Sequence, residues 1–244
     1  MKVVYQIIFF LKSLTPPILW KLFKKMKPER KYYGLNDLDK KMEKYLNYRG
    51  GYFVELGSNN GVNQSNTYFY EKKKNWNGIL IEPVLHNYLE CRKNRSSKNK
   101  FFCCACVSEQ FNNSSVEMIY SDLMTIPINL ESDIVNKVKH ANHSNTIREP
   151  EKRIDPVKFI VKARTLTDIF EEANAPRRMD FLSLDVEGAE IEVLKGINFN
   201  KYNFKYILVE TRNLETISTF LKKYKYKIKD KLSHHDYLFV NFEI

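Results

Sequence analysis

Acidic side chains lie within or at the end of three short apolar runs of this sequence. Glu55 lies in the run before Gly57, Glu82 directly follows the run 79–81, and Asp185 ends a third run. Open α/β sheets bring the carboxyl ends of their parallel strands to one edge, where ligands bind. The three carboxylates are therefore predicted to surround one bound molecule.

The segment GYFVELGSNNG at 51–61 places a strand directly before a glycine-containing turn. Glycine lets the backbone come close to a ligand. The segment differs from the dinucleotide fingerprint, because Asn59 stands at the position of its second glycine. Glu55 would also repel a pyrophosphate, whereas a carboxylate suits a ligand with a positively charged amino end.

Glu82 ends the second predicted strand, 25 positions after Gly57. An acidic group at this place can accept hydrogen bonds from both hydroxyls of a ribose. The turn and the carboxylate together favour an adenosine-type ligand that has no pyrophosphate. Taken singly, Glu55 and Glu82 could each be a surface carboxylate.

The segment DFLSLDVEGAE at 180–190 supplies the third carboxylate. Asp185 ends its strand and could orient a substrate hydroxyl or accept the proton of that hydroxyl. Gly188 opens a helix, and Glu190 lies near the start of this helix, where the macrodipole favours negative charge. We therefore assign Glu190 a structural role.

Strands and helices alternate along the part of the chain that must position these groups. Apolar runs predict strands over 52–56, 79–81, 101–107, 181–186 and 206–209, and helical spacing predicts helices over 66–74, 84–93, 165–173 and 188–196. This alternation is typical of βαβ units and a largely parallel sheet. Two further β-rich runs, 226–229 and 237–242, predict a terminal hairpin with His234 and His235 in its turn.

Composition and charge indicate one α/β domain preceded by a basic arm. With 244 residues, 43% of them hydrophobic, the chain can bury one sizeable core. Residues 1–31 hold eight Lys and Arg against one Glu, which gives 8 − 1 = +7 of the net +11. We predict an arm over 1–33 and a domain over 34–244. The stretch 108–157 lacks clear periodicity, which predicts an active-site insertion or, alternatively, a surface loop.

The basic arm suits an anionic surface, either membrane headgroups or a nucleic acid, or it serves solubility alone. Its apolar run, 3–11, is shorter than the roughly 20 residues that span a bilayer. An interfacial segment and a first helix packed on the domain are the open alternatives.

Four cysteines favour buried thiols over a metal site. Cys103 and Cys106 would point to opposite faces of a strand, and no second pair follows them at zinc-ribbon spacing. Reduced thiols suit a cytoplasmic protein, and the arm could place it at the inner face of the membrane. Asp185 and Glu210 are only two scattered carboxylates, so no metal is predicted.

On these residues the chain resembles the FkbM-type methyltransferases, a branch of the S-adenosylmethionine-dependent methyltransferases. The matching stretches are 53–61, 65–67, 78–83, 165–168, 180–190 and 235–240, within a region from about residue 34 to the C-terminus. The resemblance implies a Rossmann-like class I fold, α/β, with a mostly parallel seven-stranded sheet and a reversed C-terminal hairpin.

The resemblance also implies that S-adenosylmethionine is the cofactor and that the chain holds it at the strand ends. Glu55, Gly57 and Asn59 would surround the methionine end. Glu82 would hold the ribose.

The rest of the implied site lies after the third and fourth strands. Cys104 and Ala105 would flank the adenine, and Asp185 would lie next to the sulfonium. Asp185 is the predicted catalytic base or orienting carboxylate, with His234 or His235 as the reserve.

Three positions depart from the family pattern. Ser183 stands where the family commonly has Lys, so any catalytic role of that lysine cannot be transferred. Ser58 and Asn60 replace the more usual Ala and Asp of the first motif.

Many relatives modify sugar hydroxyls. The resemblance therefore implies an O-methyltransferase that acts on a sugar hydroxyl of a cell-surface polysaccharide, its precursor or a secondary metabolite. The expected partner is a small-molecule or glycan acceptor, with peripheral membrane contact through the arm.

Three alternatives stay open. A nucleic-acid methyltransferase suits the basic charge, but the acidic strand end at Asp185 would repel phosphates, and no Asn/Asp-Pro-Pro-aromatic loop follows it. A non-catalytic, membrane-associated module could keep the fold without the activity. A nicotinamide dehydrogenase is weakened by the missing second glycine.

Overall fold

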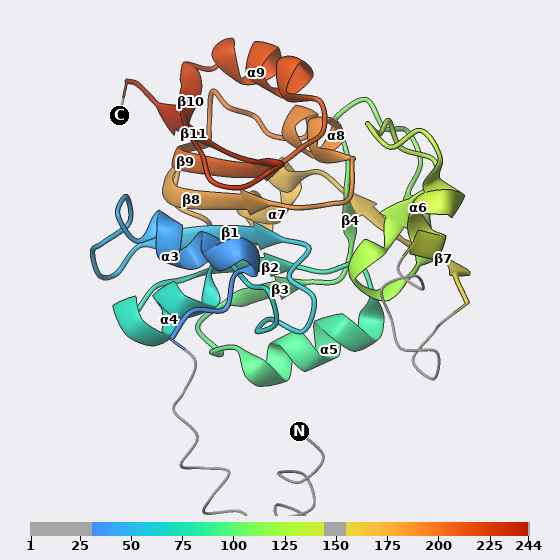
Figure 1. The fold of residues 1–244 in the computed structure, drawn as a ribbon, viewed down its shortest axis with the longest axis horizontal. Helices are drawn as coiled ribbons and strands as arrows, with labels where there is room; N and C mark the ends of the chain where they lie inside the picture. The colour runs from blue at the N-terminus through green and yellow to red at the C-terminus, as the bar shows by residue number, and fades with distance from the viewer. Residues whose placement is uncertain (1–30, 144–154, 244) are drawn as a thin grey trace, which may run out of the picture. The chain divides into compact units, whose positions relative to one another are not determined.

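The computed structural model describes residues 31–143 and 155–243 (Figure 1). Apart from Lys31, these residues belong to one compact unit, Tyr32–Ile244. Residues 1–30 of the predicted arm and 144–154 of the predicted insertion lie outside the described residues, so the division at 33/34 stays a prediction. In the described stretches no helix is both long and apolar enough to cross a bilayer.

A mixed seven-stranded sheet forms the centre of the unit, in the order β10-β11-β9-β8-β1-β2-β3. Strands β9, β8, β1, β2 and β3 are parallel, and β11 is antiparallel to both of its neighbours. The sheet consists of β1 (Tyr52–Leu56), β2 (Asn77–Ile81), β3 (Lys100–Phe102), β8 (Arg178–Leu184), β9 (Asn203–Glu210), β10 (Tyr226–Lys231) and β11 (Asp236–Asn241). The predicted α/β fold with seven strands is confirmed, and the predicted C-terminal hairpin makes the sheet mixed.

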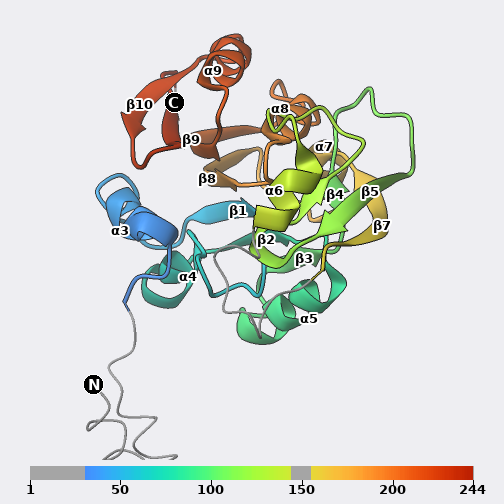
Figure 2. The same ribbon diagram turned by 45° about the vertical axis from the view of Figure 1, so that its right-hand side comes forward.

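The described part of the predicted insertion contributes to a second sheet, of the order β4-β7-β5-β6. Its elements are β4 (Ala105–Cys106), β5 (Ser115–Tyr120), the 3-10 helix η2 (Asp122–Met124), β6 (Ile126–Pro127), α6 (Lys137–His143) and β7 (Val157–Arg164). Val116, Met118 and Val161 are buried in a hydrophobic cluster of this sheet. Figure 2 shows β5, β7 and α6 beyond the carboxyl ends of the central strands.

The predicted third strand, 101–107, is wrong as a single element. β3 ends at Phe102, and β4 pairs with β7 in the second sheet, where Ala105 lies opposite Ala163. The apolar run continues through the change of sheet because Cys104 and Cys106 are buried as well. Hydropathy therefore gives no sign of the bend between the two strands.

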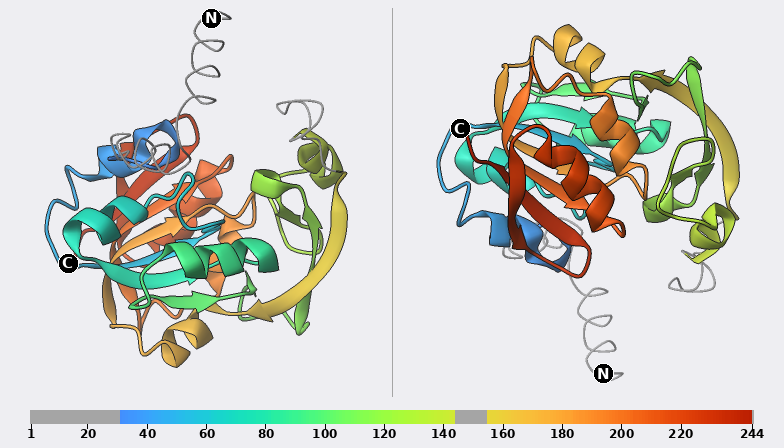
Figure 3. Two further views of the ribbon diagram at one scale, coloured as in Figure 1. Left: turned by 90° about the horizontal axis from the view of Figure 1, so that it is seen from below. Right: turned by 90° about the horizontal axis from the view of Figure 1, so that it is seen from above.

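Helices cover both faces of the seven-stranded sheet. In β1, Phe53 packs on one face, and Val54 and Leu56 pack on the other, which is the alternation of a strand buried on both sides. In Figure 3, α4 and α5 lie in front of the sheet in the left view, and α8 and α9 lie in front of it in the right view. The first face carries α3 (Leu38–Met42), α4 (Tyr68–Lys74) and α5 (Leu85–Asn94), and the second carries α7 (Leu166–Glu172), α8 (Glu190–Lys195) and α9 (Leu214–Lys222).

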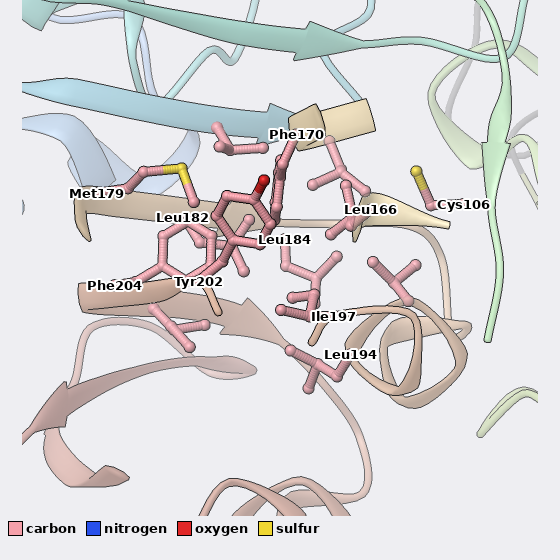
Figure 4. Close-up of a cluster of buried hydrophobic side chains, with 14 of the residues drawn as sticks. Cys106, Leu166, Phe170, Met179, Leu182, Leu184, Leu194, Ile197, Tyr202 and Phe204 are labelled. Carbon is pink, nitrogen blue, oxygen red and sulfur yellow. The ribbon is translucent and has the colours of Figure 1, made fainter. Parts of the chain in front are cut away.

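The larger core lies between the sheet and α7, α8 and α9, and part of it is drawn in Figure 4. Leu182, Leu184 and Phe204 of β8 and β9 and Phe170 of α7 are almost fully buried there. Each such side chain stabilises the fold by about 1.5–3 kcal/mol. The predicted capping pair is confirmed at the start of α7, where Thr165 accepts a hydrogen bond from the Asp168 N–H. This packing fixes the ends of β8 and β9.

Candidate active site

A cavity of about 320 Å³ lies at the carboxyl ends of β1, β2, β8 and β9. The second sheet and η2 form its opposite wall, with Met118, Asp122, Leu123 and Pro127 among the lining residues. Of the residues predicted to bind the cofactor, those that line the cavity are Gly57, Asn59, Glu82, Cys104, Ala105 and Asp185.

The turn after β1 runs against the end of β8. Gly57 has a φ of +72°, and a Cβ atom on it would lie 2.2 Å from the carbonyl oxygen of Asp185. The N–H groups of Gly57 and Ser58 both donate to the carbonyl of Ile81, at 3.1 and 3.2 Å. Because glycine alone satisfies both the dihedral angle and the close approach, this residue sets the shape of the cavity floor.

Glu82 is only 5% exposed and is held by the backbone on both carboxylate oxygens. Its Oε2 accepts from the Asn59 N–H at 2.8 Å and its Oε1 from the Val84 N–H at 2.9 Å. Burial raises the pKa of Glu82 to about 7, although these N–H groups favour the ionised form. The Asn87 side chain also favours the ionised form, and the carboxylate keeps acceptor capacity for a further donor such as a ribose hydroxyl.

Glu55 does not line the cavity. It is buried on the same face of β1 as Phe53, and its oxygens accept from Ser65 Oγ, the Asn66 N–H and Thr67 Oγ1 at 2.6–3.0 Å. The predicted contact with the methionine end therefore has no support from this placement. Instead, Glu55 fixes the loop that follows Gly57 through hydrogen bonds on the face of β1 that carries Phe53.

Arg95 is a residue of this site that the sequence analysis missed. Its buried guanidinium donates to Glu55 Oε2 at 3.2 Å, to Glu71 Oε2 at 2.8 Å and to the Gly61 carbonyl at 3.0 Å. It also donates to Ser65 Oγ and Thr67 Oγ1. No sequence signal distinguishes it from the other basic residues near the end of α5. Arg95 joins α4, β1 and the loop over 57–67 into one network.

Asp185 and Glu210 end the adjacent strands β8 and β9 and both line the cavity. Burial raises the pKa of Asp185 well above its usual range, and the Glu210 carboxyl raises it further. Burial, followed by the charges of Glu187 and Asp236, raises the pKa of Glu210 to about 7, and the charge of Arg212, followed by a side-chain hydrogen bond with Asp185, opposes this shift. The two carboxyls form a pair that can hold a proton near neutral pH.

The loop after β8 joins this pair to the second sheet. Glu187 lines the cavity, and its Oε2 lies 2.8 Å from His140 Nε2 in α6. A Cβ atom on Gly188, whose φ is +96°, would meet Ser132 Oγ at 2.6 Å and Asp133 Oδ1 at 2.7 Å. The segment around Ser132 therefore packs directly on this loop.

Glu190 and Ser183 have structural partners. Glu190 Oε1 accepts from the N–H groups of Val186 and Gly188 at the start of α8, which agrees with the predicted role, and burial raises its pKa to about 8. Ser183 Oγ accepts from Asn66 Nδ2 at 3.1 Å, on the side of Glu55.

His234 and His235 are not among the residues that line the cavity. They lie in the turn before β11, where the His235 carbonyl accepts from the Thr211 N–H at 3.0 Å. Burial lowers the pKa of His235, and the neighbouring His234 and Arg212 lower it further. The predicted reserve base is therefore not among the residues that line the cavity with Asp185.

All four cysteines are free thiols. Cys104 and Cys106 line the cavity, whereas Cys103 Sγ contacts the Pro83 carbonyl. Within residues 31–143 and 155–243, no three His, Cys, Asp or Glu side chains are grouped so that they could hold a metal ion.

A family model described as the methyltransferase FkbM domain matches residues 55–239. The match therefore runs from β1 into β11 and includes all the strand ends that form the cavity. No curated protein and no solved structure matches the chain.

Proposed function

We propose that this chain, which belongs to the FkbM methyltransferase family, transfers a methyl group from S-adenosylmethionine to a hydroxyl oxygen of a sugar. Membership in the family identifies the chain as a methyltransferase. The identity of the cofactor and the identity of the acceptor are what we propose. The observation that carries it is the cavity itself, with Glu82 at the end of β2 and the Asp185–Glu210 pair at the ends of β8 and β9.

The residues of the cavity fit an adenosine-type cofactor. Glu82 has two oxygens oriented by backbone N–H groups, and its carboxylate keeps acceptor capacity for ribose hydroxyls. Cys104 and Ala105 offer a small apolar surface for the adenine, and the turn at Gly57 leaves room for the methionine end. Bound there, S-adenosylmethionine supplies a methyl carbon on a positively charged sulfur.

Asp185 and Glu210 would provide the acid–base chemistry of the reaction. A cation next to the two carboxyls favours their ionised forms, so cofactor binding prepares the pair to accept a proton. Methylation of a hydroxyl releases one proton, and a carboxylate with a raised pKa can take it from the acceptor oxygen. Asp185, at the end of the central strand β8, is the group proposed to orient and deprotonate that oxygen.

Cofactor binding is tested by calorimetric titration with S-adenosylmethionine. Glu82→Ala should weaken binding by about tenfold to a hundredfold, because the hydrogen bonds to a charged group are lost. Glu90→Ala removes an exposed carboxylate of α5 and should leave binding unchanged. A wild-type protein that does not bind S-adenosylmethionine contradicts the proposal and favours a non-catalytic module.

The acceptor is tested by mass spectrometry of surface glycans from cells with and without the gene. The proposal expects a sugar residue to lose the mass of one CH₂ group in the deletion strain. Unchanged glycans together with altered RNA methylation would support a nucleic-acid methyltransferase instead.

The charge of the basic arm supports a membrane surface as the place of the proposed reaction. Its net charge of 8 − 1 = +7 over residues 1–31 suits the anionic cytoplasmic face of a membrane, where glycan precursors could be presented. The full chain should sediment with vesicles that contain phosphatidylglycerol and stay in solution with neutral vesicles. Equal behaviour with both vesicles contradicts this part of the proposal.

A further inference from the structure

Among the charged residues that line the cavity in the described part of the chain, one is basic, Arg212, and the others are acidic: Glu82, Asp122, Asp185, Glu187 and Glu210. Asp185 and Glu210 lie at the floor, at the ends of β8 and β9. Arg212 also lines the cavity, two residues after Glu210, and its side chain is exposed to solvent. Its backbone N–H donates to Asp133 Oδ2 at 2.8 Å. Its guanidinium lowers the pKa of Glu210 but lies within ion-pair distance of no carboxylate in the described part of the chain.

Further basic groups surround Arg212. The His235 carbonyl is hydrogen-bonded to Thr211, next to Arg212, and the His234 and His235 rings are 4.4 Å apart. Arg212, His234 and Lys231 all disfavour the protonated form of His235, and only Asp236 among its charged neighbours favours it. Asp236 is largely buried and accepts a hydrogen bond from Ser233 Oγ.

An anion bound between these basic side chains would offset the repulsion that disfavours the protonated form of His235. Carboxylates and phosphates match the guanidinium fork and form strong, charge-assisted hydrogen bonds with it. The acidic floor would repel the same anion, so an anion can be accommodated only beside Arg212.

We propose that Arg212 and His235 form an anion-binding subsite at the acceptor side of the cavity, and that the acceptor sugar carries a carboxylate or a phosphate. This inference rests on the proposed sugar methyltransferase function and narrows its substrate class. Glu210 and Arg212 are two residues apart, so their Cα atoms are at most about 7 Å from each other. The anionic group therefore belongs to the methylated sugar or to the sugar next to it, as in a uronic acid or a sugar phosphate.

The subsite is tested without any acceptor by titrating the histidines of the full chain by NMR. Sulfate is the probe, because it stays dianionic over the titration, and chloride at equal ionic strength is the reference. Sulfate should raise the pKa of His235, since a bound anion favours the protonated imidazole. Arg212→Gln should abolish this shift, whereas Lys100→Gln, an exposed lysine at the start of β3, should retain it. A pKa of His235 that is equal in sulfate and chloride overturns the inference.

The substrate class is tested with labelled S-adenosylmethionine and three acceptors: glucose, glucuronic acid and glucose 6-phosphate. A charged acceptor should exceed glucose in kcat/KM by about tenfold or more, and Arg212→Gln should remove the difference. The better of the two charged acceptors identifies the anion as carboxylate or phosphate. Equal kcat/KM values of the wild-type protein for glucose and for both charged acceptors overturn the inference and leave the proposed function intact. If the wild-type protein fails to bind S-adenosylmethionine, the proposed function fails, and the sulfate titration still decides the subsite.

Discussion

Two walls of the cavity are held in place in different ways. The wall from the first motif, which we call the cofactor wall, consists of residues 57–67 with the end of β2, and a buried network centred on Arg95 and Glu55 holds it. The wall from the second sheet, which we call the acceptor wall, consists of residues 118–130. Near its end, Lys137 Nζ donates to the carbonyls of Ile128 and Leu130, both at 2.7 Å.

The difference between the walls agrees with the ligand that we propose for each. The cofactor wall is part of the central sheet and its buried polar network, so its shape is set before any ligand arrives. The acceptor wall stands on a separate small sheet and meets the loop after β8 through a hydrophobic cluster that includes Ala189 and through polar contacts such as that of His140 with Glu187. The second wall can therefore change in sequence without disturbing the buried network of the first.

Arg95→Met should have the largest effect, because it disrupts the buried network that holds the cofactor wall. The substitution leaves Glu55 and Glu71 buried without their cation, and breaking a buried ion pair in this way costs about 3–5 kcal/mol. We expect that loss in the free energy of unfolding, measured with urea, and the loss of S-adenosylmethionine binding. Arg92→Met removes an exposed charge of the same helix and is the matched control. A small loss for Arg95→Met would mean that the network does not hold the cofactor wall.

Asp185→Asn should slow the reaction in the cavity much more than it weakens binding of the cofactor. Loss of the general base should lower kcat by roughly 10²–10³-fold, with a much smaller change in the affinity for S-adenosylmethionine. Glu210→Gln should have a smaller effect on kcat, because Asp185 is still present. Single-turnover rates and calorimetric titration measure the two quantities, and Glu215→Gln on α9 is an exposed control. Unchanged turnover in Asp185→Asn would remove this residue from the mechanism.

The buried acid of the cofactor wall predicts a pH dependence of stability. The pKa of Glu82 is raised to about 7 in the folded protein, above its unfolded value near 4.5. Above the unfolded pKa the unfolded chain loses its proton first, so Glu82 destabilises the fold increasingly between about pH 4.5 and 7 and by a constant amount above that. The full difference is up to about 3 kcal/mol.

Glu82→Gln should remove this contribution. The difference in unfolding free energy between wild type and variant should therefore change between pH 5 and pH 7.5, in favour of the variant at the higher pH. Urea titrations at the two pH values measure it. A difference that is the same at both values would mean that Glu82 is already ionised in the folded protein at pH 5.

The cofactor wall was also the part that the sequence predicted well. Strands that end at Leu56, Ile81 and Leu184 are strongly apolar, and the groups that follow them had to meet at one edge of a parallel sheet. The role of Glu55 was missed, although strand alternation puts it on the face of Phe53. Arg95 could not be found, because its partners come from three different elements.

The strands of the acceptor wall were not predicted from the sequence, because they are short and partly exposed. β6 has two residues, and β5 lies between stretches rich in Ser and Asn. A two-residue strand has no measurable period, and β6 pairs with β5, whose own pairing depends on β7, about forty residues away in the sequence. Tertiary pairing decides such a sheet, and local pattern does not.

The smallest expected effect tests the attachment of the acceptor wall through His140→Gln. The contact of His140 with Glu187 is only partly buried, so its loss should cost no more than about 1 kcal/mol. Because Glu187 lines the cavity, the KM for the acceptor should rise severalfold, while the affinity for S-adenosylmethionine stays the same.

Hydrogen exchange distinguishes a loosened wall from a lost contact with the acceptor. In His140→Gln the amides of α6 should exchange faster, and those of α4 and α5 should not, because the cofactor wall has its own network. Lys139→Gln, an exposed change in the same helix, should alter neither exchange nor KM. Faster exchange in α4 and α5 as well would show that the two walls are coupled, and the independence that we infer for them would be wrong.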